Sequence, residues 1–233
     1  MELSARAQRV WAKSGYDPES RRWLPLWLHL LDSAALAGHL AEHWLAPTVQ
    51  DLIEREFADS ASGLAPVDEF CLLASWTTGV HDVGKCTPAF SCQVTSLDDR
   101  MAEVGLRHEH VDIKERRKLP HALAGHLILR SWLTGEHGWA PGAAQALASV
   151  VGAHHGIPPT RAALTNDLSG HEHLLGDEAW ATTQRELLEL VTARTGAGPL
   201  LPGWGRHRWS QPFLVELSGL VIVADWIAST EAY

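Results

Sequence analysis

The strongest chemical signal in this sequence is the pentapeptide HDVGK at residues 81–85. His81 and Asp82, adjacent at a helix end, can present an imidazole and a carboxylate to one cation, and the following glycine lets the backbone turn away. The apolar run 67–80 leads directly into this motif and predicts that it lies at the end of a helix. A capping aspartate beside a half-buried histidine would give the same short string.

Other segments carry histidines in settings that suit a ligand. His29 lies among leucines, where a buried imidazole needs a polar partner. Asp32, three residues later on the same helical face, is a candidate to orient that ring. His154 and His155 stand in tandem at a predicted helix end, where neighbouring side chains can face two adjacent metal ions.

Two further residues complete the candidate set. His121 follows Pro120 at the start of a predicted helix, and Asp225 is the lone acid in the apolar run GLVIVADWIA. A buried carboxylate is unfavourable without a cation or a donor beside it. Taken singly, a satisfied core histidine, a helix-start residue and a salt-bridged acid remain alternatives for His29, His121 and Asp225.

Together these residues are enough to hold two divalent ions with open coordination positions. The full set is His29, His81, Asp82, His121, His154, His155 and Asp225. Imidazole-rich ligation favours Mn, Fe, Co, Ni or Zn. Magnesium is the less favoured alternative, because it prefers oxygen ligands.

The elements that must position these residues are predicted to be helices, because helix-period patterns dominate and period-two β-branched runs are nearly absent. We expect an all-α, compact helical bundle in one domain over 1–233, with long loops around a central metal site. The expected helices cover 24–45, 67–80, 121–133, 143–155, 178–194 and 213–229. The expected loops, 95–118, 156–176 and 195–212, exceed the roughly 4–6 residues of ordinary connections.

Composition excludes several classes. The chain has 233 residues with 45% hydrophobic residues, which argues against disorder, and a formal charge of −9, which argues against a general nucleic-acid coat protein. Its three cysteines form no CxxC pair, so we expect a reducing, cytoplasmic setting. The N-terminus lacks a signal peptide and the closing apolar run contains Asp225, so no membrane association is expected.

The order of His29, His81-Asp82 and Asp225 resembles the HD superfamily of metal-dependent phosphohydrolases, which is all-helical. His121 and the pair at 154–155 resemble its two-metal members. Within that superfamily the chain is most similar to the HD nuclease domain of the CRISPR-associated helicase-nuclease of type I systems. The matching segments are WAKS (11–14), WLPLWLHLLDSAALAG (23–38), HDVGK (81–85), PHALAG (120–125), AHHG (153–156) and SGLVIVADWIAS (218–229).

This resemblance implies a metal-dependent nuclease that cuts single-stranded DNA exposed by a crRNA-guided surveillance complex. It also implies a superfamily-2 helicase, which we expect in cis or in trans because the sequence has no GxxxxGK[ST] motif. We assign His29, His81, Asp82 and Asp225 to one ion, and His121, His154 and His155 to the second. Asp82 is expected to bridge the ions. Lys85 is expected to contact a substrate phosphate, with a solvated lysine at the helix end as the alternative.

DNA must still bind an acidic chain, and two divalent ions would add about four positive charges locally. The segment 204–209 interleaves aromatic and basic residues, which makes Trp204, Arg206 and Arg208 candidate DNA contacts. A surface loop with Trp209 tucked into the core is the alternative. Ser218 is a further candidate donor to the DNA backbone, and the basic cluster 114–118 is more typical of a solvated face.

Three other functions stay open. An HD phosphodiesterase acting on cyclic dinucleotides or nucleotides shares HDVGK and the histidine pair, but here that pair is followed by GIPP rather than Gly-Tyr-Pro. His39 and His43 match the HxxEH pattern of zinc proteases, without a metal-binding acid at a telling distance. A catalytically silent, metal-stabilised docking module would use some of the 11 tryptophans as anchors.

Overall fold

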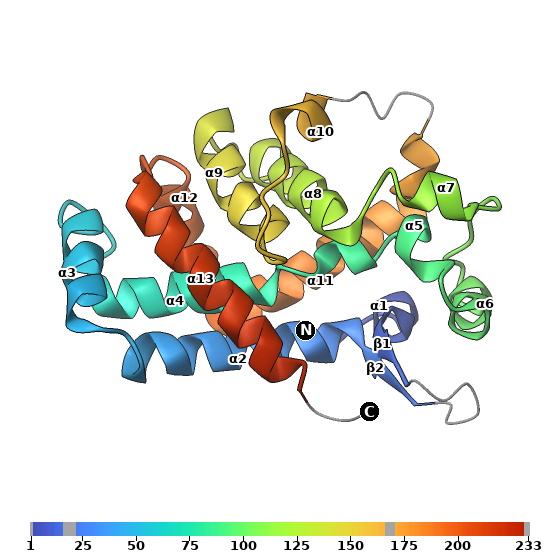
Figure 1. Ribbon diagram of the computed structural model, residues 1–233, viewed down its shortest axis with the longest axis horizontal. Coiled ribbons are helices and arrows are strands. Elements are labelled where there is room, and N and C mark those ends of the chain that lie inside the picture. Colours follow the sequence, from blue (N-terminus) through green and yellow to red (C-terminus); the bar gives the residue numbers. More distant parts are fainter. Residues whose placement is uncertain (1, 16–21, 166–170, 231–233) are drawn as a thin grey trace.

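The computed structural model describes residues 2–15, 22–165 and 171–230, and this part is mainly helical (Figure 1). The all-α prediction is confirmed, with one small antiparallel pair of strands, β1 (Trp11–Ser14) and β2 (Trp23–Pro25). The helices, including three 3-10 turns, are α1 (Ala5–Arg9), α2 (Leu26–His43), α3 (Pro47–Glu56), α4 (Pro66–Gly79), η1 (Val83–Lys85), α5 (Pro88–Ser91), α6 (Thr95–Glu103), α7 (Ile113–Arg116), α8 (His121–Gly135), α9 (Pro141–Gly152), α10 (Arg161–Thr165), η2 (Glu172–Leu174), α11 (Glu178–Thr195), η3 (Gly198–Leu200), α12 (Leu201–Trp204) and α13 (Gln211–Ala228).

All six predicted helices are present, and their ends follow local chemistry. The Asp177 carboxylate accepts the first free N–H groups of α11, and Ser210 does the same for α13. Gly196, at φ +73°, ends α11 in the left-handed conformation that glycine adopts readily. Pro25 ends β2 and caps α2 instead of lying in its first turn.

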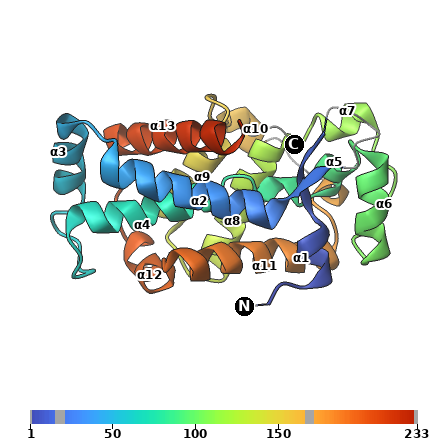
Figure 2. The ribbon, with the colours of Figure 1, turned by 90° about the horizontal axis from the view of Figure 1, so that it is seen from below.

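The core is built on the packing of α2 against α4, with α13 along one side and α11 along the opposite side (Figure 2). Gly79 permits this close approach, because a Cβ atom there would lie 2.5 Å from a Val191 methyl group and 3.1 Å from the Ala34 Cβ. Trp76 and Trp180 fill the interior and are fully buried. Figure 1 shows the pair α8 and α9 on the far side of α4 from α2.

The predicted long loops are only partly irregular. Residues 95–118 contain α6 and α7, and residues 195–212 contain η3 and α12. The segment 156–176 contains α10 and η2, and its residues 166–170 lie outside the described part of the chain. The sequence did not reveal α6, because Leu97 and Met101 are its only buried residues and one pair does not establish a helical period.

Helix α13 is long and apolar enough to cross a membrane by length and composition alone. Core helices of soluble proteins pass the same test, and 39% of this segment is buried inside the structure. The helix packs against α2 and α9 and carries the buried Asp225. A place in the core accounts for the buried face of the helix, whereas Val215, Trp226 and Ile227 are exposed.

Candidate metal centre

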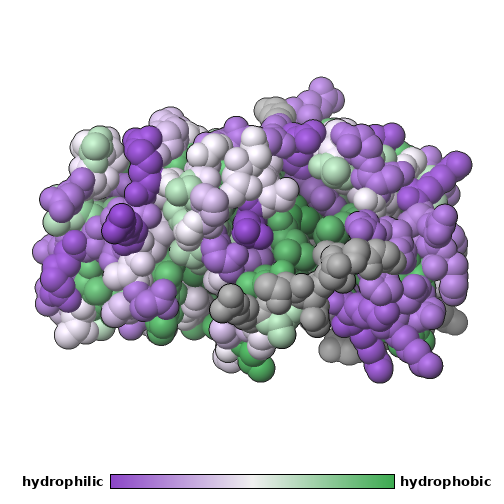
Figure 3. Space-filling view, turned by 90° about the horizontal axis from the view of Figure 1, so that it is seen from above, coloured by the Kyte–Doolittle hydropathy of each residue, from purple (hydrophilic) through white to green (hydrophobic). Residues whose placement is uncertain are grey.

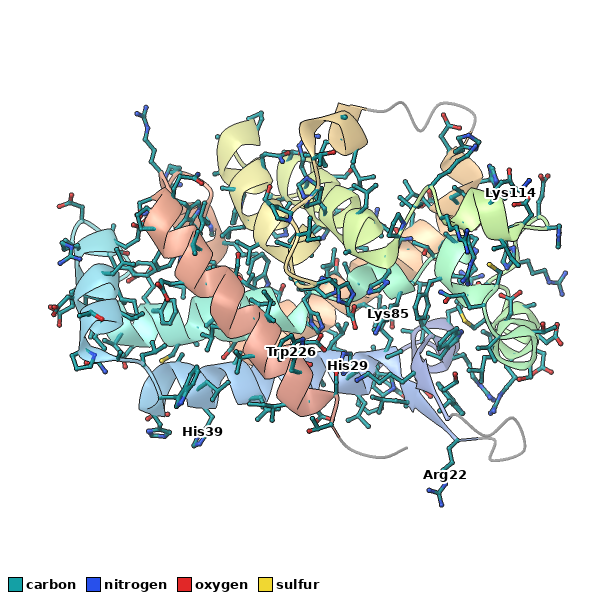
Figure 4. All side chains as sticks on the ribbon, viewed as in Figure 1. Arg22, His29, His39, Lys85, Lys114 and Trp226 are labelled. Atoms are coloured by element: carbon teal, nitrogen blue, oxygen red, sulfur yellow. The ribbon has the colours of Figure 1, made fainter. Side chains whose placement is uncertain are left out.

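The seven predicted ligands come together in the middle of the molecule, from five separate segments. His29 comes from the first turn of α2 and Asp225 from the last turns of α13. They form two adjoining groups that satisfy metal-ligand spacing: His29, His81, Asp82 and Asp225, and His121, His154 and His155. Figure 4 shows His29 and Lys85 close to each other at this place.

The Asp82 carboxylate joins the two groups. Its Oδ2 lies 3.0 Å from the His29 Nε2 and 3.5 Å from the His81 Nε2. Its Oδ1 faces the second group, at 3.5 Å from the His121 Nε2 and 3.4 Å from the His154 Nε2. The carboxylate therefore has one oxygen toward each group.

The other acid, Asp225, belongs to the first group. Its Oδ1 lies 3.4 Å from the His29 Nε2 and 3.3 Å from the His81 Nε2. Atoms bound at about 2.1 Å from one ion lie about 3.0 Å apart in an octahedron and about 3.4 Å apart in a tetrahedron. The separations in this group therefore suit a shared cation.

Two of the histidines have their lone pairs fixed toward the centre by the backbone. The His81 Nδ1 donates to the Thr78 carbonyl at 2.6 Å, and the His154 Nδ1 donates to the Val151 carbonyl at 2.7 Å. With the hydrogen on Nδ1, each Nε2 carries a lone pair. Both Nε2 atoms and the Asp82 Oδ1 are buried and have no hydrogen-bond partner among the described residues. Such unpaired buried acceptors are unfavourable without a cation, so the residues present fit a bound metal.

The charges of the site also suit metal binding. Burial would raise the pKa of Asp82, but Lys85, His81, His154 and His29 hold it well below its usual range. The pKa of Asp225 is likewise lowered by His29 and His81 against the effect of burial. Burial lowers the pKa of His121 to about 3, so its ring stays neutral near pH 7. Ionised carboxylates and neutral imidazoles are the forms that bind a metal. His29 is the exception, because burial would lower its pKa but Asp225 and Asp82 raise it, so an ion there would displace a proton.

Lys85 lies inside the site rather than on a solvated helix end. Its Nζ is 2.5 Å from the Asp82 Oδ2 and 5.6 Å from the centre of the Phe90 ring, and the residue is 8% exposed. Lys13, in the WAKS segment, is a second cation that the sequence reasoning gave no role. It interacts electrostatically with Lys85, Asp82 and Asp225, and burial lowers its pKa.

Ser229 is another residue that sequence reasoning missed. Its hydroxyl donates to the Asp225 Oδ1 at 3.0 Å, which orients the carboxylate. The available signal was the spacing of four residues along the closing helix, which places both on one face. The predicted contact of Asp32 with His29 is wrong, because Asp32 is exposed and the His29 Nδ1 has no hydrogen-bond partner in the described chain.

The candidate DNA contacts lie apart from the ligands. The prediction for Trp204 is wrong, because its ring is 2% exposed and its Nε1 donates to the buried Glu69 at 2.9 Å. Arg206 and Arg208 are exposed and border a hollow next to Trp139. Ser218 is half-buried, and its hydroxyl donates to the Leu214 carbonyl at 2.8 Å.

The zinc-protease pattern has no support in the described part of the chain. The His39 and His43 rings are 4.6 Å apart on α2, and Figure 4 shows His39 pointing away from the protein. No third ligand joins them among the described residues. The basic cluster 114–118 is in the hydrophilic end of the molecule that carries α6 and α7 (Figure 3).

Comparisons with known proteins identify relatives of the whole chain. The family described as Cas3, HD domain, matches residues 11–233. The CRISPR-associated nuclease/helicase Cas3 of Streptococcus thermophilus is 30% identical over 96% of this chain. The CRISPR-associated endonuclease/helicase Cas3 of Thermus thermophilus is 32% identical over 98% of it. The chain spans about a quarter of these relatives, 24% and 23% of their lengths.

A solved structure shows the same fold. The crystal structure of the Thermus thermophilus Cas3 HD domain in the presence of Ni²⁺ matches with a TM-score of 0.62 and 28% identity. The match covers 97% of this chain and 78% of that one.

Proposed function

This chain belongs to the Cas3 HD-domain family, and from that premise we propose that it is a metal-dependent nuclease that hydrolyses single-stranded DNA in type I CRISPR interference. The observation that carries the proposal is the set of buried, unpaired acceptors on His81, Asp82 and His154, which two separate segments of the chain bring together. A polar cluster of this kind has no structural use without a cation.

The site would hold two divalent ions. His29, His81, Asp82 and Asp225 would hold one, and His121, His154 and His155 would hold the other, with Asp82 shared. When bound, such ions activate a water molecule and neutralise the scissile phosphate. Five imidazoles favour Mn, Fe, Co, Ni or Zn, and magnesium is the weaker alternative.

The chain's own residues determine how substrate reaches the site. His29, His81 and His154 are buried, whereas His155 is exposed and 22% of the His121 side chain is accessible. The phosphodiester must therefore approach over the second group. In this proposal Lys85 offers its ammonium group to a phosphate oxygen, held in place by its contact with Asp82.

Partners are needed because the chain itself is acidic. A formal charge of −9 predicts weak DNA binding at physiological salt in the absence of help. The relatives are named nuclease/helicase and endonuclease/helicase. We infer that a superfamily-2 helicase, in cis or in trans, and a crRNA-guided surveillance complex deliver the single strand.

A cleavage assay tests this function. Purified protein with Mn²⁺ or Ni²⁺ should degrade an end-labelled single-stranded oligonucleotide, and excess EDTA should stop the reaction. Asp82→Ala should be inactive, whereas Asp51→Ala, an exposed acid on α3, should cleave like the wild type. Preferential hydrolysis of a cyclic dinucleotide in parallel reactions would favour the phosphodiesterase alternative. Stoichiometric metal without hydrolysis of either substrate would favour a docking module.

A further inference from the structure

Two hollows on the surface run together beside α9 and α13. One, of about 850 Å³, is bordered by Arg206 and Arg208. The other, of about 640 Å³, lies between α9 and α13. Both are lined by Gly142, Ala146 and Gln211, so they form one continuous depression, which we call the α9–α13 groove. Helices α9 and α13 pack against each other (Figure 1).

The inner end of the groove is lined by residues from the two segments that carry the ligands at 154–155 and 225. Ala153 and Gly156 line its inner end and flank the two histidines at 154–155 in the chain. On the opposite wall, Ile222 lines the groove one turn before Asp225. Helix α9 has 12 residues and is therefore about 18 Å long, and it leads from the hollow that the arginines border to the histidines at 154–155.

The charge along the groove suits a polyanion. None of the described residues that line the two hollows is an aspartate or a glutamate, although the chain carries 28 acids. Arg206 and Arg208 are exposed at the outer end, and bound ions would make the inner end positive. His207 lies between the two arginines in the chain. Its Nε2 is 3.0 Å from the Glu56 Oε1, so this nitrogen already has a partner and is not counted as a phosphate contact.

The middle of the groove is uncharged. Gly142, Ala146 and Gly219, which carry small side chains or none, are among the residues that line it. Val215, 66% exposed, offers an apolar wall, and Gln145 and Gln211 offer polar groups. An apolar wall with amide groups suits the nucleobases and sugars of a single strand. The phosphates would then bind at the arginines and at the bound ions.

We propose that the α9–α13 groove is the track along which single-stranded DNA reaches the metal centre, with Arg206 and Arg208 binding its phosphates at the outer end. This inference rests on the proposed function, because it names the path of that substrate. Unlike the prediction from the sequence, this proposal excludes Trp204 as a DNA contact. It also connects Arg206 and Arg208 to the metal centre by a path along α9.

The first test reverses charge at the outer end. R206E/R208E should weaken binding of a fluorescent single-stranded 20-mer by about tenfold, measured by anisotropy in an Asp82→Ala background. The slope of log affinity against log salt should become shallower by about 1.4, the value for two lost phosphate contacts on a single strand. The matched control K114E/R117E makes the same charge change at two exposed basic residues on the α6 and α7 end.

The control decides whether the effect belongs to the groove. Equal weakening by both double variants, or no weakening by R206E/R208E, would overturn the proposal. With catalytic Asp82 intact, R206E/R208E should hydrolyse bis(p-nitrophenyl) phosphate within twofold of the wild type, since this small diester does not reach the arginines. A wild type that hydrolyses neither substrate would instead refute the proposed function, and the anisotropy result would still decide the groove.

The second test fills the middle of the groove. Gly219 lines the groove, and a Cβ atom there would meet nothing within 4 Å, so Gly219→Phe adds a ring at an open position of this wall. Cleavage of the 20-mer should fall by about tenfold, with hydrolysis of the small diester retained. Gly135→Phe, at an equally open glycine on α8, is the control. Unchanged cleavage by Gly219→Phe, together with loss of binding to a helicase partner, would show that the groove docks protein and not DNA.

Discussion

Two regions of this molecule place histidines against carboxylates, and they use the same atoms differently. At the end of the molecule near α5 and α6, the His108 Nε2 lies 3.0 Å from both oxygens of Asp98 and 3.4 Å from the Ser91 hydroxyl. Its Nδ1 donates to the Glu109 carbonyl at 2.6 Å, so both ring nitrogens have partners. In the proposed metal centre, the Nε2 atoms of His81 and His154 have no hydrogen-bond partner among the described residues.

The difference shows what marks a metal site. The hydrogen bond to Asp98 raises the pKa of His108, and both of its ring nitrogens already have partners, so no lone pair is left for a metal. Against the effect of burial, the pKa of His29 is also raised, by Asp225 and Asp82, so the pKa direction alone does not separate the two regions. Burial lowers the pKa of His121 to about 3, and a neutral ring keeps its lone pair. The unpaired inward acceptors, rather than the residue types, distinguish the two regions.

The largest expected effect comes from removing the bridge between the groups. Asp82→Asn should lower single-strand cleavage by at least about a thousandfold, because an amide cannot supply the charge that two cations share. Circular dichroism should show a folded protein. Retention of more than a tenth of the wild-type rate would contradict the bridging role of this carboxylate.

A smaller change should separate the two groups. His155→Ala removes an exposed ligand of the second group and leaves His29, His81, Asp82 and Asp225 intact. We expect the metal content measured by mass spectrometry to fall from two ions per chain to one, with most cleavage lost. Loss of both ions would show that the groups do not bind independently.

The hydrogen bond from Ser229 should have an intermediate effect. Ser229→Ala leaves the Asp225 ligand in place but removes the donor that orients it. Metal affinity should fall by about tenfold, in line with the effect of other groups that hold metal ligands. A competition titration with a chelator measures the change, and Ser229→Thr, which keeps the hydroxyl, should restore the affinity.

The smallest effect is expected at His108, because both of its ring nitrogens already have partners. His108→Ala should leave metal content and cleavage unchanged and lower the free energy of unfolding by about 1 kcal/mol. Urea denaturation at two pH values checks this figure. A fall in metal content would contradict the contrast between the two regions.

The pH dependence of that effect follows from the two pKa directions. The raised pKa of His108 makes its contribution complete below about pH 6.5 and lost as pH rises through the folded-state value. The lowered pKa of Asp98 makes its contribution complete above about pH 3.9 and lost as pH falls through the folded-state value. His108→Ala should therefore destabilise most between about pH 4 and 6.5, and less at pH 8.5.

Much of the fold could be predicted, because its long helices carry repeated apolar positions. The strands and α6 could not, since two or three buried residues such as Leu97 and Met101 fit several periods. Among the ligands, Asp225 stood out as an acid in an apolar run. The local sequence could not show which of two histidines on α8 is a ligand. His121 joins the second group, whereas His126 is buried on the same helix and joins neither group. Only the packing of α8 decides which ring faces Asp82.

The central claim is that the seven ligands hold two ions that serve single-strand cleavage. The most direct test is to load the metal-free protein with Mn²⁺ or Ni²⁺, count bound ions by mass spectrometry and assay the same sample on a labelled single strand. We predict two ions per chain and complete degradation that EDTA prevents. Two bound ions with an intact strand would contradict the account.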